Sequence, residues 1–141
     1  MSDTLIIIPT YNERENVRAI ARAVFAAADD ADMLFVDDNS PDGTGTIADE
    51  MAAADPRVKV LHRAEKNGLG RAYIAGFKWA LERQYEFIFE MDADFSHNPA
   101  DIPRMRAAAQ DAAGACTTDD HGGILPMMPW TQVTWAKSAA E

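Results

Sequence analysis

The stretch LIIIPTYNERENVRAIARAVF, residues 5–25, decides the fold, because an apolar run passes through a polar turn into an amphipathic segment. The bulky apolar run at residues 5–8 predicts a short strand. Asn12 and Glu15 stand in a capping-box arrangement, which predicts that a helix begins there. The apolar residues that follow recur at helical spacing and predict a face packed in the core: Val17, Ile20, Ala21, Val24 and Phe25.

The same unit of strand, turn and helix recurs three more times along the chain. Further strands are predicted at residues 33–36, 58–62 and 87–91. Two more helical stripes predict core positions, at Ile47, Ala48, Met51 and Ala52 and at Tyr73, Gly76, Phe77, Ala80 and Leu81. Asn98, Pro99 and Asp101 suit the cap, first position and first turn of a fourth helix. This alternation predicts the α/β class, with a mainly parallel sheet flanked by helices.

After Ala113 the regular spacing of apolar residues stops. Residues 114–141 show neither the period of a strand nor that of a helix. They are therefore predicted to form an atypical tail, which is either disordered or the product of a shifted reading frame. The regular part is residues 1–113. The sheet is then expected to be incomplete on its C-terminal side and to expose an unpaired edge.

Composition excludes several classes of protein. The formal charge of −10 and the absence of a basic block argue against a nucleic-acid partner. No apolar run approaches the ~20 residues of a spanning helix and no leader is seen, so the chain is expected to be cytoplasmic. Cys116 cannot form an internal disulfide, and it has no ligand spacing with His62 or His121, which argues against a zinc site.

The residues that follow each predicted strand are polar, and they carry the candidate chemistry. In an open parallel sheet, ligands bind beyond the carboxyl ends of the strands. Residues 9–13, 37–44, 63–70 and 92–97 therefore bring at least five carboxylates to one edge. Carboxylates gathered in this way repel one another unless a cation lies among them. Asp92 and Asp94 could both bind one Mg²⁺ or Mn²⁺, ions that usually share sparse oxygen sites with substrate phosphates.

Each of these motifs also has a plainer explanation. An isolated Asp-x-Asp pattern is often only the solvated end of a strand. Residues 40–43 fit a turn, whereas the preceding Asp37 and Asp38 fit either a turn or recognition of a base or ribose. Lys66 and Arg71 could contact phosphate or simply be solvated, and His97 is expected to order its loop through a local hydrogen bond.

Taken in order, the segments at residues 9–13, 37–44, 66–72 and 91–99 resemble the family 2 glycosyltransferases. Within that family, DNSPDGT at residues 38–44 and DADFSHNP at residues 92–99 look most like the polyprenyl (dolichyl) phosphate mannosyltransferases. The resemblance covers about residues 4–113. It implies a GT-A fold, which is Rossmann-like, and a nucleotide-sugar-binding role for residues 1–113.

The resemblance also implies roles for individual residues. Pro9, Tyr11, Glu13, Val36 and Asp38 would hold the guanosine of GDP-mannose. Asp92, Ala93 and Asp94 would meet its diphosphate. Asp92 and Asp94 would bind the Mg²⁺ or Mn²⁺, and Asp94 is the expected catalytic residue.

The implied reaction is transfer of mannose, with inversion, to a polyprenyl or dolichyl phosphate at the cytoplasmic face of a membrane. The enzyme would be peripheral to that membrane, at its surface or beside a membrane subunit. Two alternatives stay open: a catalytically inactive fragment that still binds nucleotide sugar, and a family 2 enzyme with a UDP-sugar donor. Relatives continue past the fourth helix with an arginine-bearing acceptor region that residues 114–141 do not show, which makes the activity of this chain uncertain.

Overall fold

The structure is a computed structural model that describes residues 3–66, 68–83, 85–111, 115–118, 124–126 and 134–137. Its central sheet contains four parallel strands, β1 (Thr4–Thr10), β2 (Asp32–Asp37), β3 (Val58–His62) and β4 (Phe87–Glu90). The helices are α1 (Val17–Ala27), α2 (Thr44–Ala54), α3 (Leu69–Leu81) and α4 (Ile102–Asp111). A short 3₁₀ turn, η1 (Pro99–Asp101), leads into α4. The predicted α/β class and its four strand-helix units are confirmed.

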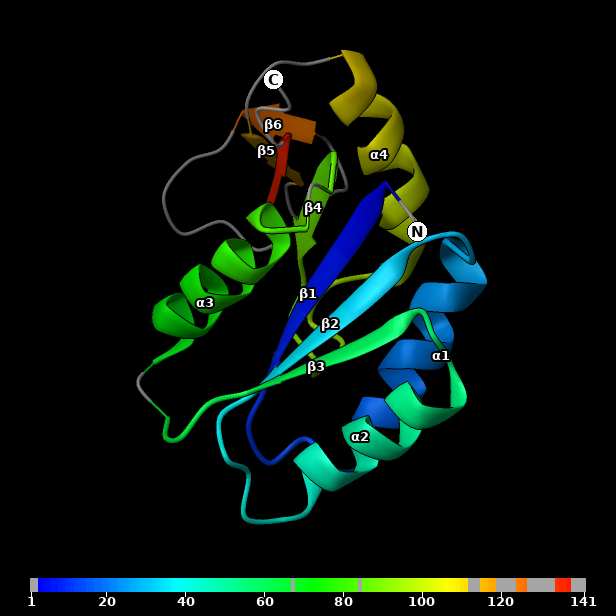
Figure 1. Ribbon diagram of the computed structural model, residues 1–141. Helices are drawn as coiled ribbons and strands as arrows, with labels where there is room; N and C mark the ends of the chain where they lie inside the picture. Colours follow the sequence, from blue (N-terminus) through cyan, green and yellow to red (C-terminus); the bar gives the residue numbers. More distant parts are fainter. Residues whose placement is uncertain are drawn as a thin grey trace.

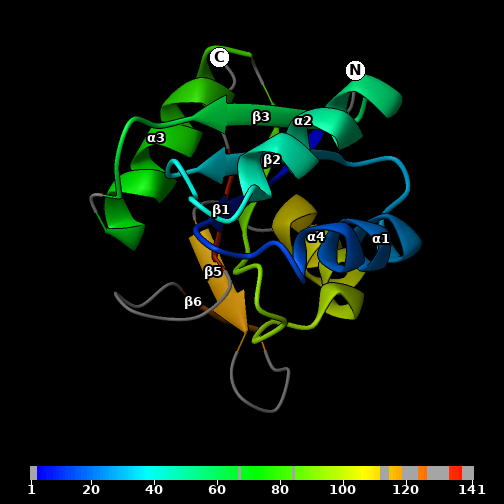
Figure 2. The ribbon, with the colours of Figure 1, turned by 90° about the horizontal axis from the view of Figure 1, so that it is seen from below.

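Helices cover both faces of the sheet (Figures 1 and 2). On one face, Ile6 and Ile8 of β1 pack with residues of α1, α2 and α4. On the other, Leu5 and Ile7 pack with residues of α3. The strand β1 lies between β2 and β4 and is buried along its whole length, as expected of a central parallel strand. No helix in the described part of the chain is long and apolar enough to cross a lipid bilayer.

The predicted helix faces are mostly confirmed, but two local predictions are wrong. Helix α1 begins at Val17, with Asn16 rather than Asn12 at its N-cap, so the capping box does not form. The backbone N–H groups of Asn12 and Glu13 instead donate to side chains in the loop after β2. Leu81, predicted to lie in the core, is the last residue of α3 and is 58% exposed. The cap at Asn98 is confirmed, since its side chain accepts from the N–H of Ala100.

Helix α3 approaches the sheet closely at Gly76. A Cβ atom added there would lie 2.7 Å from Cγ2 of Ile7 and 3.4 Å from Cγ2 of Val36. The distance to Ile7 is below van der Waals contact, so a larger residue would force the Ile7 side chain or the helix to shift. By contrast, a Cβ added at Gly70, near the start of the same helix, would meet nothing within 4 Å.

A buried polar contact joins β2 to the segment before β4 at the amino end of the sheet. The hydroxyl of Tyr85 donates to Oδ2 of Asp32 over 2.7 Å, and both side chains are buried. Burial and the Asp32 carboxylate raise the pKa of Tyr85 above its ordinary range. Nearby, Arg106 of α4 forms ion pairs with Asp3 and Asp30. These contacts lie at the end of the sheet opposite to the loops described below.

The segment after residue 113 contributes three strands, which the absence of periodicity did not predict. They are β5 (Ala115–Thr118), β6 (Ile124–Pro126) and β7 (Thr134–Lys137), and the sheet order is β3-β2-β1-β4-β7-β5-β6. Because β7 pairs antiparallel with β4, the expected unpaired edge beside β4 does not exist. Residues 112–114, 119–123, 127–133 and 138–141, which include His121, lie outside the described residues. The division of the chain at residue 113 stays a prediction.

Candidate active site

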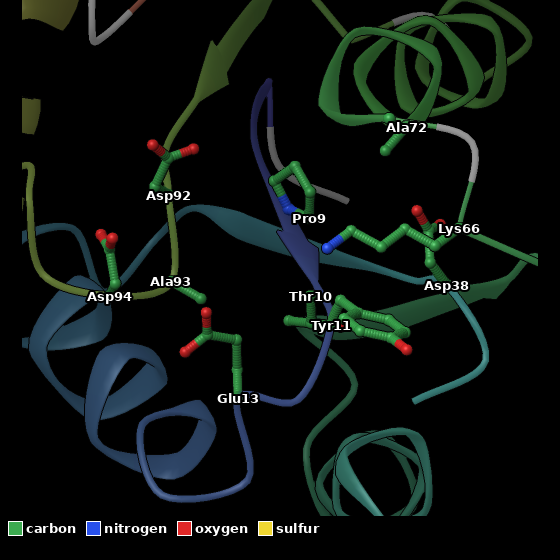
Figure 3. Close-up of a pocket in the computed structure, with 11 residues that line it drawn as sticks. Pro9, Thr10, Tyr11, Glu13, Asp38, Lys66, Ala72, Asp92, Ala93 and Asp94 are labelled. Carbon is green, nitrogen blue, oxygen red and sulfur yellow. The ribbon is translucent and has the colours of Figure 1, made fainter. Parts of the chain in front are cut away.

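A pocket of about 260 Å³ lies at the carboxyl edge of the parallel strands (Figure 3). The loops after all four strands contribute to its lining, which consists of Pro9, Thr10, Tyr11, Glu13, Asp38, Lys66, Gly68, Ala72, Asp92, Ala93 and Asp94. In the close-up, Glu13, Asp92 and Asp94 lie toward one side and Tyr11, Lys66 and Asp38 toward the other. The pocket thus joins an acidic side to a side that carries an aromatic ring and a cation.

The first loop is held in place by the second. The N–H of Asn12 donates to Oγ of Ser40 over 3.1 Å, and the N–H of Glu13 donates to Oγ1 of Thr44 over 3.0 Å. Asn12 adopts a left-handed backbone with φ of 55°, which an asparagine tolerates better than most residues. These contacts turn the chain sharply between Tyr11 and Glu13, so that both residues line the pocket.

The two adjacent aspartates of the second loop have different environments. Asp37 is buried and accepts hydrogen bonds from the hydroxyls of Thr10 and Ser40 and from the N–H of Ser40, which gives it the role of ordering the turn. Asp38 lines the pocket, and its carboxylate lies 3.2 Å from Nη1 of Arg63. Burial raises the pKa of Asp38, although the positive charge of Arg63 opposes that rise.

The turn predicted after these aspartates is present. Asp42 accepts from the N–H of Thr44 over 3.0 Å, where α2 begins, and Gly43 has a positive φ of 92°. Asn39 is also left-handed, with φ of 56°. The second loop therefore serves both as an entry to α2 and as a wall of the pocket.

The third loop places a cation against the first. Nζ of Lys66 lies 4.4 Å from the centre of the Tyr11 ring, within the range of a cation-π contact. Both residues line the pocket. Lys66 is therefore not an isolated solvated side chain, whereas Arg71 is exposed and does not line this pocket. The neighbouring Asn67 lies outside the described residues.

The fourth loop carries the predicted metal ligands, Asp92 and Asp94. Strand β4 ends at Glu90, one residue earlier than predicted, and both aspartates follow it. Asp94 accepts from the N–H of Ser96 over 2.9 Å, and the hydrogen bonds from Ser96 lower the pKa of Asp94. Phe95, between them, is left-handed with φ of 64°, an unusual conformation for an aromatic residue.

Asp92 is held from two directions. The hydroxyl of Tyr73, on α3, donates to its Oδ1 over 2.7 Å. The N–H of Asp92 donates to Nδ1 of His97 over 3.0 Å, which confirms the loop-ordering hydrogen bond predicted for His97. Burial and the adjacent carboxylates raise the pKa of Tyr73 above its ordinary range, so the phenol stays protonated and donates. Burial also lowers the pKa of His97, and its Nε2 has no partner in the described part of the structure.

The donor set at this loop fits a divalent metal of the Mg²⁺ or Mn²⁺ kind. Asp92 and Asp94 both line the pocket, and each has one carboxylate oxygen in a hydrogen bond. No group of three or more acidic, histidine or cysteine side chains is arranged around one point among the described residues. A two-carboxylate set is what these ions use when water and substrate phosphates complete the coordination.

Seven of the eight predicted donor-binding residues line this one pocket: Pro9, Tyr11, Glu13, Asp38, Asp92, Ala93 and Asp94. Val36, in β2, does not, because its side chain is fully buried in the core cluster that contains residues of α3. Sequence reasoning missed the part played by Tyr73, which was assigned only to the core stripe of its helix. A hydroxyl group is unusual in an apolar helical stripe, and it could have indicated that Tyr73 makes a polar contact.

The chain is similar to known proteins in sequence. The family model described as glycosyl transferase family 2 matches residues 5–124. The polyprenol monophosphomannose synthase of Mycolicibacterium smegmatis is 48% identical over 139 residues, which cover 96% of this chain and 52% of that protein. The undecaprenyl-phosphate mannosyltransferase of Micrococcus luteus is 55% identical over 108 residues, covering 77% and 44% respectively. The chain thus spans about half the length of these relatives.

Solved structures agree on the fold. A mannosyltransferase from Pyrobaculum calidifontis, in complex with GDP-Man and Mn²⁺, superposes with a TM-score of 0.68 at 18% identity, covering 96% of this chain and 44% of that one. Glucosyl-3-phosphoglycerate synthase from Mycobacterium tuberculosis gives a TM-score of 0.66 at 14% identity, with coverage of 96% and 55%. The parallel sheet with flanking helices is therefore a GT-A fold, and its partial coverage agrees with the predicted incompleteness.

Proposed function

The chain belongs to glycosyl transferase family 2, and on that premise we propose that it is the donor-binding part of a mannosyltransferase. The donor is GDP-mannose, the acceptor is a polyprenyl or dolichyl phosphate, and mannose is transferred with inversion of configuration. The ion is Mg²⁺ or Mn²⁺. The protein acts peripherally at the cytoplasmic face of a membrane, at its surface or beside a membrane subunit. The names of the two relatives reported above, a polyprenol monophosphomannose synthase and an undecaprenyl-phosphate mannosyltransferase, support this choice of acceptor and sugar.

The observation that carries the proposal is the convergence of four strand-end loops on one pocket. Pro9, Tyr11, Glu13 and Asp38 hold the guanosine, and any contribution from Val36 comes through its backbone, since the side chain is buried. The diphosphate lies beside Asp92, Ala93 and Asp94. Asp92 and Asp94 hold the metal, and Asp94 is the catalytic residue by virtue of that contact with the reacting diphosphate.

The residues of the pocket suit transfer to a phosphate acceptor. A phosphate monoester is already largely ionised near neutral pH, so its oxygen attacks the anomeric carbon without a protein base. The metal, when bound, neutralises the charge that develops on the leaving diphosphate. Glu13, Asp38, Asp92 and Asp94 keep the pocket anionic, which favours binding of the donor together with a divalent cation over binding of the diphosphate alone.

The pocket also fits a competing function. Donor binding needs only the pocket, so a protein that binds nucleotide sugar there without catalysing transfer is the second candidate. The third is a family 2 enzyme with a UDP-sugar donor. Both candidates keep the pocket and the metal. The second differs from the first in forming no product, and the third differs in the nucleobase of its donor.

Calorimetric titration of the chain with GDP-mannose, with and without Mn²⁺, tests donor and metal together. We expect binding heat that depends on Mn²⁺, and no uptake in its presence would refute the proposal. A transfer assay with a short-chain polyprenyl phosphate follows, in which binding without product identifies the inactive fragment. Competition between GDP and UDP for the pocket decides the donor base.

A further inference from the structure

We propose that Tyr73 is a positioning residue that sets the carboxylate of Asp92 for the metal and the diphosphate. This inference rests on the proposed function and adds to it a residue from α3, an element outside the four strand-end loops. Tyr73 does not line the pocket, so it acts through Asp92 and not on the ligand.

The hydrogen bond itself selects one orientation of the Asp92 side chain. The hydroxyl of Tyr73 donates to Oδ1 over 2.7 Å, the length expected of an O–H donor bound to a carboxylate. In the described part of the structure, Oδ2 accepts no hydrogen bond. The carboxylate is thereby held with one oxygen engaged by the protein and one left for a cation, which makes Asp92 a single-oxygen ligand.

The backbone of Asp92 is fixed independently. Its N–H donates to Nδ1 of His97, whose side chain is 5% exposed and therefore held firmly in the protein. His97 sets where the Asp92 backbone lies, and Tyr73 sets which way its side chain points. Asp94 is held locally: its carboxylate accepts from the N–H of Ser96, two residues further along the same loop.

Tyr73 is itself anchored by a rigid element. It lies on α3, whose residues Ala72 and Ala80 are buried against the sheet, and its ring packs at the margin of the same core cluster. A hydroxyl on a packed helix is held in position more precisely than a hydroxyl on a loop, so it can orient the Asp92 carboxylate more precisely. Groups that orient a metal ligand in this way commonly change metal affinity by about 10- to 100-fold when removed.

Packing of the ring is the competing explanation for Tyr73, and the chain offers a matched control. Tyr85 also donates its hydroxyl to an aspartate over 2.7 Å, but its partner Asp32 lies at the amino end of the sheet, away from the pocket. Tyr73→Phe and Tyr85→Phe each remove one hydroxyl and keep the ring. Each variant loses one hydrogen bond that is partly or fully buried. They differ in the carboxylate that loses its donor, which is Asp92 in the first variant and Asp32 in the second.

The experiment measures Mn²⁺ affinity in the presence of saturating GDP-mannose, by electron paramagnetic resonance of free Mn²⁺, for wild type and both variants. Thermal unfolding is recorded alongside. We expect Tyr73→Phe to weaken Mn²⁺ binding by about tenfold or more, and Tyr85→Phe to leave it within twofold of wild type while lowering the melting temperature. Replacing Tyr73 by 4-aminophenylalanine, which restores a donor at the same place, is expected to recover the affinity.

Three results would overturn the inference. They are wild-type Mn²⁺ affinity in Tyr73→Phe, equal loss in Tyr73→Phe and Tyr85→Phe, and no recovery with the amino analogue. If Tyr73→Phe does not fold, Tyr73→Met takes its place in the comparison. Failure of both to fold, while Tyr85→Phe folds, assigns Tyr73 a structural role and also rejects the inference. Absence of Mn²⁺ binding in wild type, by contrast, rejects the proposed function itself.

Discussion

Asp94 is one of the two carboxylates proposed to hold the metal. Its carboxylate has a lowered pKa and one oxygen bound by the N–H of Ser96, so it is ionised and oriented at neutral pH. Asp94→Asn removes one anionic ligand while keeping the size of the side chain. We expect Mn²⁺-dependent binding of GDP-mannose to weaken by at least about tenfold, or about 1.4 kcal/mol, in calorimetric titration.

The control for this variant is Asp49→Asn, which removes the same charge from the exposed surface of α2. Asp49 pairs with His62, and neither residue lines the pocket. Mn²⁺-dependent binding is expected to be unchanged there. Equal behaviour of the two asparagine variants would mean that Asp94 acts only through net charge and is not a ligand.

Tyr85 gives the structure a pH-dependent component of stability. The pKa of its phenol is raised in the folded state above the ordinary value near 10, so the folded state holds the proton more tightly than the unfolded state. Its stabilising contribution is fully present below about pH 10 and is lost as pH rises toward the folded pKa. Tyr85→Phe should lower the free energy of unfolding by about 1–3 kcal/mol at pH 7, because Asp32 loses its donor.

The difference in stability between wild type and Tyr85→Phe is therefore expected to shrink as pH is raised from 9 to about 11.5. Urea unfolding at a series of pH values measures it. A difference that stays constant over that range would contradict the assignment of the phenol as the donor to Asp32.

Site residues could be predicted from the sequence where they directly follow a parallel strand. The carboxyl ends of parallel strands meet at one edge, so residues directly after a strand are neighbours wherever the strands lie. That rule brought Tyr11, Asp38 and Asp94 together. It could not separate Asp37 from Asp38, which depends on which side of the strand end each faces. Nor could it find Tyr73, whose contact depends on the rotation of α3.

At the level of elements, α3 and β1 approach each other closely at Gly76. Gly76→Ala places a methyl group 2.7 Å from Cγ2 of Ile7. Overpacking of this kind costs about 1–3 kcal/mol, and a contact this short places the cost above the gain of about 1 kcal/mol that alanine brings to a helix interior. We expect a net loss of stability in urea unfolding.

Gly70→Ala is the matched change in the same helix, where the new methyl group meets nothing within 4 Å. It should leave stability unchanged or raise it by up to about 1 kcal/mol. A loss as large as that of Gly76→Ala would show that glycine is needed throughout α3 for another reason.

The start of α1 shows why local patterns mislead at element boundaries. Asn12 and Glu15 have the spacing of a capping box, and nothing nearby in the sequence argues against it. The loop is instead held by Ser40 and Thr44, which are distant in sequence. A long-range contact therefore overrides the local signal and delays the helix to Val17.

At the level of the whole molecule, the strand β7 closes the exposed side of β4. Its register pairs Ile88 with Ala136 and Phe89 with Trp135. A chain ending at residue 111 would lack β5, β6 and β7 and leave that side of β4 unpaired, and such an edge promotes association. We expect the 1–111 chain to self-associate in size-exclusion chromatography with light scattering, relative to residues 1–141.

Ala136→Pro tests the same pairing without shortening the chain. Proline removes one backbone donor from a strand that lies between β4 and β5, so the ladder is interrupted at that point. It should move the full-length chain toward the behaviour of the 1–111 chain. A monomeric and equally stable 1–111 chain would mean that β7 contributes little.

These three strands could not be predicted from periodicity, since they contain only three or four residues each. A run of that length does not establish a period, and an antiparallel strand can form wherever an edge offers partners. The four parallel strands were predictable because each leads into a long amphipathic helix that confirms its assignment.

The central position of β1 has a consequence for biosynthesis. Among the four parallel strands, β1 leaves the ribosome before the other three, yet Leu5 pairs with Asp32 on one side and with Ile88 on the other. Its apolar residues stay uncovered until most of the described chain has been translated, and uncovered strands of this kind are the segments that chaperones bind and that aggregate when chaperones are scarce. We expect the yield of soluble protein to rise when translation is slowed or a chaperone that binds extended apolar segments is co-expressed.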